Sequence, residues 1–279
     1  MVQFSFTESQ LPRSAEPALT LVGTSYTDDR GQQTFQIMRE LNHNLAQQAD
    51  ASALAVPQVL FYDPSLRLLA QQRVVGIPYS DLLDRAEPTN YVQLAGAALA
   101  LLHNQHLAIG NEAWLRDHLA DLLHPQPAQL GDQLPEYRAQ IEMLIAEMIS
   151  QERHIKPAIE TGPIHRNFGP SKVLYREGRA WVIDWDLFAQ GDPALDIANF
   201  VVHLQVRIAQ QPGRALAAFI DGYFAARPLL ILERVPLYAA FAYLRLAAKC
   251  FQRKEAHWED QLRDYLRRGE ECLAARSIV

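Results

Sequence analysis

Two polar stretches on either side of an expected hairpin contain the residue types that phosphoryl transfer requires. The first, residues 164–174, reads IHRNFGPSKVL, and in the second, residues 183–198, an Asp leaves a strand before a Gly-Asp-Pro turn. Phosphoryl transfer needs a base-like carboxylate beside the acceptor hydroxyl and oxygen ligands that hold Mg²⁺ on the phosphates. The first stretch would supply the base and one ligand, and the second would supply the main metal carboxylate.

The second stretch resembles the aminoglycoside phosphotransferase and choline kinase family, whose pattern there is I-D-[WF]-x-x-x-x-x-G-D-P-x-x-D-[IL]-A. The matching residues are Ile183, Asp184, Trp185, Gly191, Asp192, Pro193, Asp196, Ile197 and Ala198. The resemblance covers nearly the whole chain and is weakest in the first third. It implies an α+β, two-lobed protein-kinase-like fold, with a small N-terminal α/β lobe over residues 1–75. A larger, mainly helical lobe would follow over residues 76–279, with the catalytic-loop hairpin at about 164–186.

The first stretch departs from the family pattern H-G-D-x-x-x-x-N-[VI]-[LI]. By this resemblance His165 supports the loop, Asn167 stands at the position of the catalytic Asp, and Lys172 stands at the metal-ligand Asn. Arg166 stands where the family has Gly. An Asn accepts no proton at neutral pH, and loss of a positioned general base typically costs ~10²–10⁴-fold in rate. A Lys ammonium has three donors and no acceptor, so it cannot ligate Mg²⁺.

The nucleotide positions of the first third are also altered. The family strand lysine that contacts the phosphates aligns with Thr24, and no lysine precedes Lys156. Gln72 and Val74 align with the hinge that would contact the nucleotide. The residues before Thr24 contain no glycine-rich phosphate loop.

These substitutions predict a rearranged metal position. Lys172 would pair directly with Asp184, the retained metal carboxylate, and fill the place of the metal ion. Such a pair need not be a net stabiliser, but it would neutralise a carboxylate that has lost its metal.

Three functions follow from these residues. In the first, the chain is a pseudokinase that binds a partner or a small ligand, with phosphotransfer lost or severely reduced. In the second, it is an active ATP-dependent kinase for a hydroxyl of a small hydroxylated or amine-bearing molecule, and the acidic balance of the chain suits a cationic acceptor. In the third, it is a scaffold or oligomer-forming protein. No cofactor is expected, and ATP and Mg²⁺ enter only in the active-kinase case.

Composition restricts the partners. The chain has 279 residues, a formal net charge of -6 and two cysteines. An acidic balance argues against nucleic acid and an anionic membrane as partners. We found no secretory signal and no apolar run long enough to span a bilayer, and two cysteines make no disulfide framework, so a cytoplasmic setting is expected.

The elements expected in the first third are a strand, a helix and a hairpin. The strand covers residues 18–22, and a turn at 28–31 leads into a helix marked by Phe35 and Met38. Strands at 56–62 and 66–75, joined by an Asp-Pro turn, form the hairpin, and residues 76–78 mark a break.

The rest of the chain is predicted to be mainly helical. Helices are expected at 81–85, 91–103, 134–153, 196–209 and, with breaks near Pro228 and Pro236, over 215–275. Residues 173–183 read as a hairpin with a turn at Gly178, and residues 184–193 read as a loop.

Several polar residues have plain structural interpretations. Asp192 and Asp196 would cap the following helix. Arg166 would lie on the surface or contact an anion near the loop. Histidines expected to pack in the core or to lie on a polar helix face, rather than bind metal, are His103, His106 and His203. Cys250 is expected to be a buried thiol. Acidic residues expected on solvated helix faces, or facing a cationic acceptor, are Asp117, Asp121, Glu136, Glu142 and Glu147.

Overall fold

The computed structural model describes most of the chain. The described residues are 20–48, 52–84, 88–208, 212–225 and 229–275. They belong to two compact units. Unit 1 consists of Met1–Gly110, Pro170–Phe188 and Ala217–Ala226, and unit 2 consists of Asn111–Gly169, Ala189–Leu216 and Arg227–Val279. These units do not coincide with the lobe boundary expected after residue 75, which stays a prediction.

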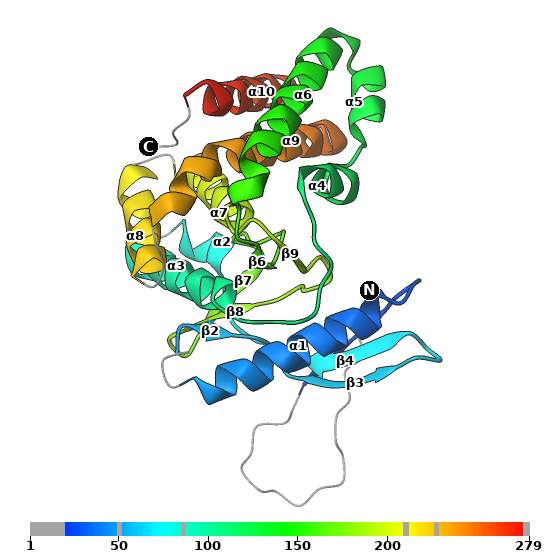
Figure 1. The fold of residues 1–279 in the computed structure, drawn as a ribbon, viewed down its shortest axis with the longest axis vertical. Coiled ribbons are helices and arrows are strands. Elements are labelled where there is room, and N and C mark those ends of the chain that lie inside the picture. The colour runs from blue at the N-terminus through cyan, green and yellow to red at the C-terminus, as the bar shows by residue number, and fades with distance from the viewer. Residues whose placement is uncertain (1–19, 49–51, 85–87, 209–211, 226–228, 276–279) are drawn as a thin grey trace, which may run out of the picture. The chain divides into compact units, whose positions relative to one another are not determined.

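The first sheet of unit 1 is antiparallel and has the strand order β1-β4-β3. Its strands are β1 (Leu21–Ser25), β3 (Val59–Asp63) and β4 (Leu68–Gln72). Helix α1 (Arg30–Gln47) packs against β3 and β4, and Figure 1 shows it lying along this sheet. Met38 and Leu41 of α1 are almost completely buried, as the helical spacing of apolar residues predicts. The expected helix and the following hairpin are therefore confirmed.

The second sheet of unit 1 has the order β2-β8-β7-β5. Its strands are β2 (Leu54–Ala55), β5 (Ile77–Pro78), β7 (Val173–Arg176) and β8 (Arg179–Val182). The β7–β8 hairpin is confirmed, and both residues of its tight turn, Glu177 and Gly178, have positive φ of 53° and 75°. Such a turn matches the twist of the flanking strands. The expected break at 76–78 is wrong, because Ile77 and Pro78 pair with β7.

Two further helices belong wholly to unit 1. They are α2 (Tyr79–Leu82) and α3 (Thr89–His103). The predicted apolar face of α3 is confirmed, since Val92, Ala95, Leu99 and Leu102 have no exposed surface. Helix α8 (Pro212–Phe224) begins in unit 2 and ends in unit 1.

Unit 2 is mainly helical. Its helices are α4 (Leu115–Leu122), α5 (Pro127–Gln133), α6 (Arg138–Ile155), α7 (Ala194–Arg207), α9 (Val235–Arg253) and α10 (Trp258–Ala275). Short 3₁₀ turns are η1 (Pro135–Tyr137), η2 (Lys156–Ala158) and η3 (Leu229–Arg234), and β6 (Gly162–Ile164) pairs with β9 (Ala189–Gly191). Helix α9 packs against α6, α7 and α10, and most of its residues are buried. It is therefore the central helix of this unit.

Three expectations for the second half of the chain need correction. Residues 184–193 are not all loop, because β9 lies within them. Pro236 does not break a helix but lies in the first turn of α9, where a missing backbone N–H is tolerated. Cys250 is half-buried rather than buried. The expected break at Pro228 and the start of the strand expected at 18–22 lie outside the described residues.

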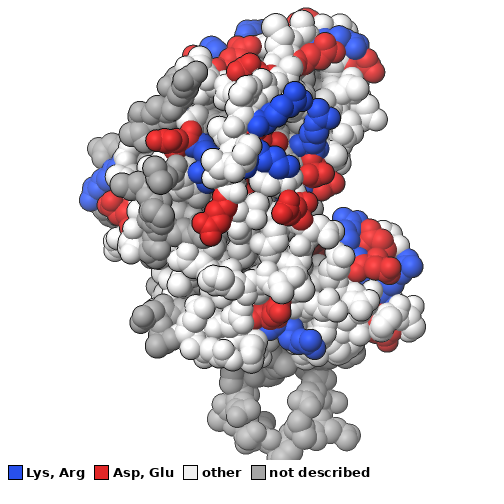
Figure 2. All heavy atoms as spheres, viewed as in Figure 1, with Lys and Arg blue, Asp and Glu red and all other residues white. Residues whose placement is uncertain are grey.

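The surface carries charges of both signs. On the face drawn in Figure 2, acidic and basic residues lie in mixed groups. Within the described ranges, no helix is both long enough and apolar enough to cross a bilayer.

Candidate functional site

The hairpin of unit 1 brings Lys172 and Asp184 together. Val173 pairs with Val182, and the N–H of Ile183 donates to the carbonyl oxygen of Lys172 at 3.0 Å. The two residues that flank the paired strands must therefore lie side by side. The Lys172 ammonium forms an ion pair with Asp184 Oδ2, and the two side chains are 29% and 33% exposed.

This ion pair decides whether the site fits a divalent cation. One oxygen of the retained carboxylate contacts an ammonium, and the second family ligand position is the lysine itself. In the part of the chain that the structure describes, no group of three or more His, Cys, Asp or Glu side chains is arranged to hold a metal ion. The residues present do not fit Mg²⁺, because the donors that it needs are oxygen atoms.

The loop after Asp184 is fixed by its own residues. Asp184 has φ of 70°, a left-handed conformation that Asp tolerates better than most residues. The indole N–H of Trp185 donates to the carbonyl oxygen of Val182 at 2.9 Å, and Trp185 is 1% exposed. The loop therefore turns sharply at Asp184 and is anchored in the core by the next side chain.

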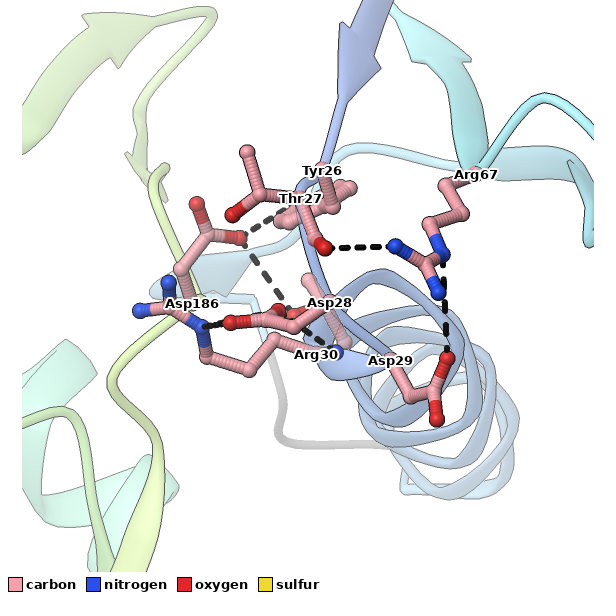
Figure 3. A network of polar contacts seen from close by, with 8 residues as sticks. Tyr26, Thr27, Asp28, Asp29, Arg30, Arg67 and Asp186 are labelled. Carbon is pink, nitrogen blue, oxygen red and sulfur yellow. Dashed lines mark hydrogen bonds and ion pairs between the residues drawn. The ribbon is translucent and has the colours of Figure 1, made fainter.

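Asp186 ties this loop to the start of α1. The Tyr26 hydroxyl donates to Asp186 Oδ1 at 2.6 Å (Figure 3). The Thr34 hydroxyl donates to the same atom at 3.3 Å. Burial raises the pKa of Asp186, and burial together with the Asp186 hydrogen bond raises the pKa of Tyr26. Two hydroxyl donors thus hold a partly buried carboxylate two residues beyond the metal position.

The basic residues beside this network are already paired. Arg30 contacts Asp28 at 2.8 Å, and Arg67 donates to the carbonyl oxygen of Thr27 at 2.5 Å and lies 4.0 Å from Asp29 (Figure 3). The ion pairs among these contacts are exposed to solvent, so they add little to stability.

The aligned nucleotide positions lie in the first sheet and its exit. Thr24 is on β1 opposite Leu69 of β4. The N–H of Gln72 donates to the carbonyl oxygen of Gln58 at 2.7 Å, and Val74 is half-buried after β4. Their suggested part in nucleotide contact stays a prediction.

In unit 2 the loop around His165 is organised by Asp196. The backbone N–H of His165 donates to Asp196 Oδ2 at 2.6 Å, and the backbone N–H of Asn167 donates to His165 Nδ1 at 3.3 Å. Both His165 and Asp196 have no exposed surface. The prediction that Asp196 caps the following helix is wrong. Its carboxylate accepts a hydrogen bond from the His165 loop, and the N-cap residue of α7 makes no side-chain cap hydrogen bond.

Asn167 faces an arginine that the sequence did not single out. Arg245 of α9 donates through Nη2 to Asn167 Oδ1 at 3.0 Å and through Nη1 to Asn199 Oδ1 at 3.2 Å. Asn199 in turn donates to the carbonyl oxygen of Phe168 at 2.6 Å. Burial, with the nearby Arg166, lowers the pKa of Arg245 to about 10.

Arg166 is buried, so its expected place on the surface is wrong. It is 5% exposed, donates through Nε to His118 Nδ1 at 3.1 Å, and pairs through Nη2 with Asp121 Oδ2 at 2.8 Å. Its φ of 65° is the left-handed conformation that suits the family Gly and costs other residues about 1–2 kcal/mol. Burial, followed by Arg166 and Arg245, lowers the pKa of His118, which leaves a neutral ring that accepts the Arg166 hydrogen bond.

Asp192 has a structural role at the start of α7. Its Oδ1 accepts a hydrogen bond from the N–H of Ala194 at 3.0 Å, as a capping carboxylate would. It also forms a two-point ion pair with Arg234, at 2.7 and 2.9 Å. The Asp192 side chain is fully buried, so Arg234 supplies the charge that compensates it.

Comparison with protein families assigns the chain. The model described as the phosphotransferase enzyme family matches residues 16–234. The chain belongs to this family. A search of the curated proteins found no significant match.

Solved structures show the fold of this phosphotransferase-family chain. A choline/ethanolamine kinase family protein from Mesorhizobium loti has a TM-score of 0.63 and 15% identity, with 94% of this chain and 87% of that chain covered. Amicoumacin kinase hAmiN has a TM-score of 0.61 and 11% identity, with 96% of this chain and 90% of that chain covered. Spectinomycin phosphotransferase APH(9)-Ia has a TM-score of 0.57 and 11% identity, with 93% of this chain and 85% of that chain covered. The predicted kinase-like fold, with a small N-terminal sheet lobe and a larger, mainly helical C-terminal part, is confirmed.

The remaining histidines of this phosphotransferase-family chain have packing roles or lie at the surface. His103 Nδ1 forms a hydrogen bond with the Tyr223 hydroxyl at 2.7 Å, and His106 is exposed. Burial and three nearby cations, Arg245 first among them, lower the pKa of His203 to about 4. Asp121 is committed to Arg166, and the other acidic residues weighed as an acceptor face are exposed, namely Asp117, Glu136, Glu142 and Glu147.

Sequence reasoning missed the partners of the site. Asp186 falls at an unspecified position of the family pattern, and Tyr26 and Arg245 lie far from it in sequence. One signal was present for Arg245, because it stands inside the apolar run of α9, where a charged residue needs partners.

Proposed function

We propose that this phosphotransferase-family chain is a pseudokinase, with ATP-dependent phosphotransfer lost or severely reduced, that acts by binding a partner or a small ligand. The observation that supports this most directly is the Lys172–Asp184 ion pair at the metal position. The setting proposed for it is cytoplasmic.

The electrostatics of that pair oppose magnesium. A divalent ion at Asp184 would lie beside the Lys172 ammonium, which already contacts the same carboxylate. Two unit charges 4 Å apart interact by about 4 kcal/mol at an effective dielectric constant of about 20, and the repulsion doubles for a divalent ion. Both side chains are about one-third exposed, so water reduces this figure, but its sign is unfavourable.

The base and phosphate positions support the same proposal. Asn167 presents an amide whose oxygen already accepts a hydrogen bond from Arg245, so it offers no carboxylate to an acceptor hydroxyl. Thr24 puts no cation on β1. Three separate substitutions thus weaken the base, the metal ligand and the phosphate contact of one reaction.

ATP consumption in the presence of small hydroxylated and amine-bearing acceptors tests the proposal. Wild type should show no acceptor-dependent turnover at ordinary kinase rates, and the double variant Asn167→Asp, Lys172→Asn should show more. Lys254→Asn is the matched control, because Lys254 is exposed and its φ of 48° is one that Asn tolerates. Ordinary kinase turnover by wild type would overturn the proposal. Thr24→Lys is tested separately, since it addresses the phosphate contact rather than the base and the metal ligand.

A second candidate is an active kinase for a small molecule. It is favoured by the retained Asp184 loop and by the structural relatives, which include kinases of choline or ethanolamine and of spectinomycin and amicoumacin. The same assay separates it from the first. A scaffold role is the third candidate, and a concentration-dependent oligomeric state in solution would support it.

A further inference from the structure

Among the described residues, the Arg245 guanidinium contacts neutral groups, including the Phe241 ring at 5.8 Å. Its two hydrogen bonds go to the amide oxygens of Asn167 and Asn199, which are neutral. Among the residues that the structure describes, no carboxylate lies within ion-pair distance of the Arg245 guanidinium. A partly buried cation normally has such a partner, because burial without one is costly.

Two acidic groups of unit 2, Asp196 and Asp121, each contact another group. Asp196 attracts Arg245 electrostatically, but its Oδ2 accepts the 2.6 Å hydrogen bond from the backbone of His165. Asp121 is exposed and pairs with Arg166. Burial and then the nearby Arg166 lower the pKa of Arg245, and the attraction of Asp196 offsets only part of that shift.

The Arg245 guanidinium has more N–H donors than its two side-chain hydrogen bonds use. An Arg side chain has five N–H donors, and those of Arg245 make two hydrogen bonds to side chains. The side chain is partly exposed, as is that of Asn167. Lys249 lies one turn further along α9 and is exposed. Oxyanions suit this arrangement, because a guanidinium binds carboxylate or phosphate through parallel hydrogen bonds.

We propose that Arg245, positioned by Asn167 and Asn199, binds the oxyanion of a small ligand, a phosphate or a carboxylate group. The proposal deepens the proposed function, on which it rests, by naming the ligand class. The ligand is anionic, in contrast to the cationic acceptor considered for an active kinase.

Asn167 has a specific part in this proposal. An Asp at the same position would place a carboxylate oxygen about where Asn167 Oδ1 now lies, 3.0 Å from Arg245 Nη2. That internal carboxylate would pair with the guanidinium and compete with any external anion. The substitution that removes the catalytic base therefore also leaves Arg245 available to a ligand.

Titration of the purified full chain with inorganic phosphate at constant ionic strength tests the proposal. Binding is followed by calorimetry and by NMR of the His203 ring, whose pKa is lowered by burial and then by Arg245. Wild type should bind phosphate saturably. Arg245→Gln and Asn167→Asp should each weaken binding roughly ten- to hundredfold, the loss expected for a charge-assisted hydrogen bond. Arg263→Gln, at an exposed pair on α10, is the control and should leave binding unchanged.

The outcomes separate the alternatives. Absence of saturable binding to wild type, binding that survives Asn167→Asp, or equal binding of chloride would each overturn the proposal. If Arg245→Gln does not fold, the phosphate titration of Asn167→Asp is sufficient to test the proposal, since Asp is nearly isosteric with Asn and this variant should fold. A parallel titration with acetate tells whether phosphate or carboxylate is preferred. ATP is absent from these titrations, so a kinase activity found separately would refute the proposed function without deciding this result.

Discussion

The hydrogen bond between Tyr26 and Asp186 should be a measurable part of the stability of unit 1. Tyr26→Phe removes one hydroxyl and leaves the ring in place. The change deletes a 2.6 Å hydrogen bond to a partly buried carboxylate and leaves only the longer Thr34 contact, at 3.3 Å. It therefore isolates the contact that ties the Asp184 loop to the start of α1.

The expected loss follows from the geometry. A hydrogen bond to a charged group contributes about 1.5–3 kcal/mol to stability, and this contribution is lost when the donor is removed. Because Tyr26 and Asp186 are both only partly buried, water can replace the hydroxyl in part, and we expect about 1–2 kcal/mol. The penalty should fall in an Asp186→Asn background, where the acceptor is neutral.

Urea unfolding followed by tryptophan fluorescence measures this loss, since Trp185 is adjacent to Asp186. Tyr62→Phe is the matched control, because the Tyr62 hydroxyl has no hydrogen-bond partner among the described residues. The control should change the free energy of unfolding by less than about 0.5 kcal/mol. Equal midpoints for the two variants would refute the reasoning about this contact.

Three further perturbations address the charges around the site. Asp186→Asn should stabilise the fold more at pH 7 than at pH 4. Burial raises the pKa of Asp186 in the folded state above 3.8, so the stability that wild type has when Asp186 is protonated is lost as the pH rises through the folded pKa. Urea midpoints of both proteins at the two pH values check this. Arg234→Met should cost about 3–5 kcal/mol in thermal or urea unfolding, since it leaves the Asp192 carboxylate buried and unpaired. Arg166→Gly should relieve the left-handed backbone but lose the contacts to His118 and Asp121, for a net loss of about 1 kcal/mol; a more stable variant would contradict this.

Local elements of the fold were predictable because their signals lie within a few residues. The apolar spacing of α1 and α3 determines which face is buried, and the turn at Gly178 predicts the β7–β8 hairpin. That hairpin in turn brings Lys172 beside Asp184, so the predicted ion pair is present in the structure.

What could not be predicted depends on long-range contacts. Arg166 was expected at the surface because most arginines lie there, but His118 and Asp121, some 45 residues earlier, hold it inside. The strand β5 was missed because two residues carry no periodicity and only the pairing with β7 defines it. The Arg245 contact to Asn167 joins residues 78 positions apart, and no local pattern encodes it.

The most direct test of the central claim is a thermal shift measured with ATP, with and without Mg²⁺. Ligand at one hundred times its Kd stabilises a protein by about 2.7 kcal/mol. We predict that Mg²⁺ adds no stabilisation to wild type, because the Lys172 ammonium holds Asp184, and that it adds stabilisation to the double variant Asn167→Asp, Lys172→Asn. A Mg²⁺-dependent shift of this size in wild type would contradict the account.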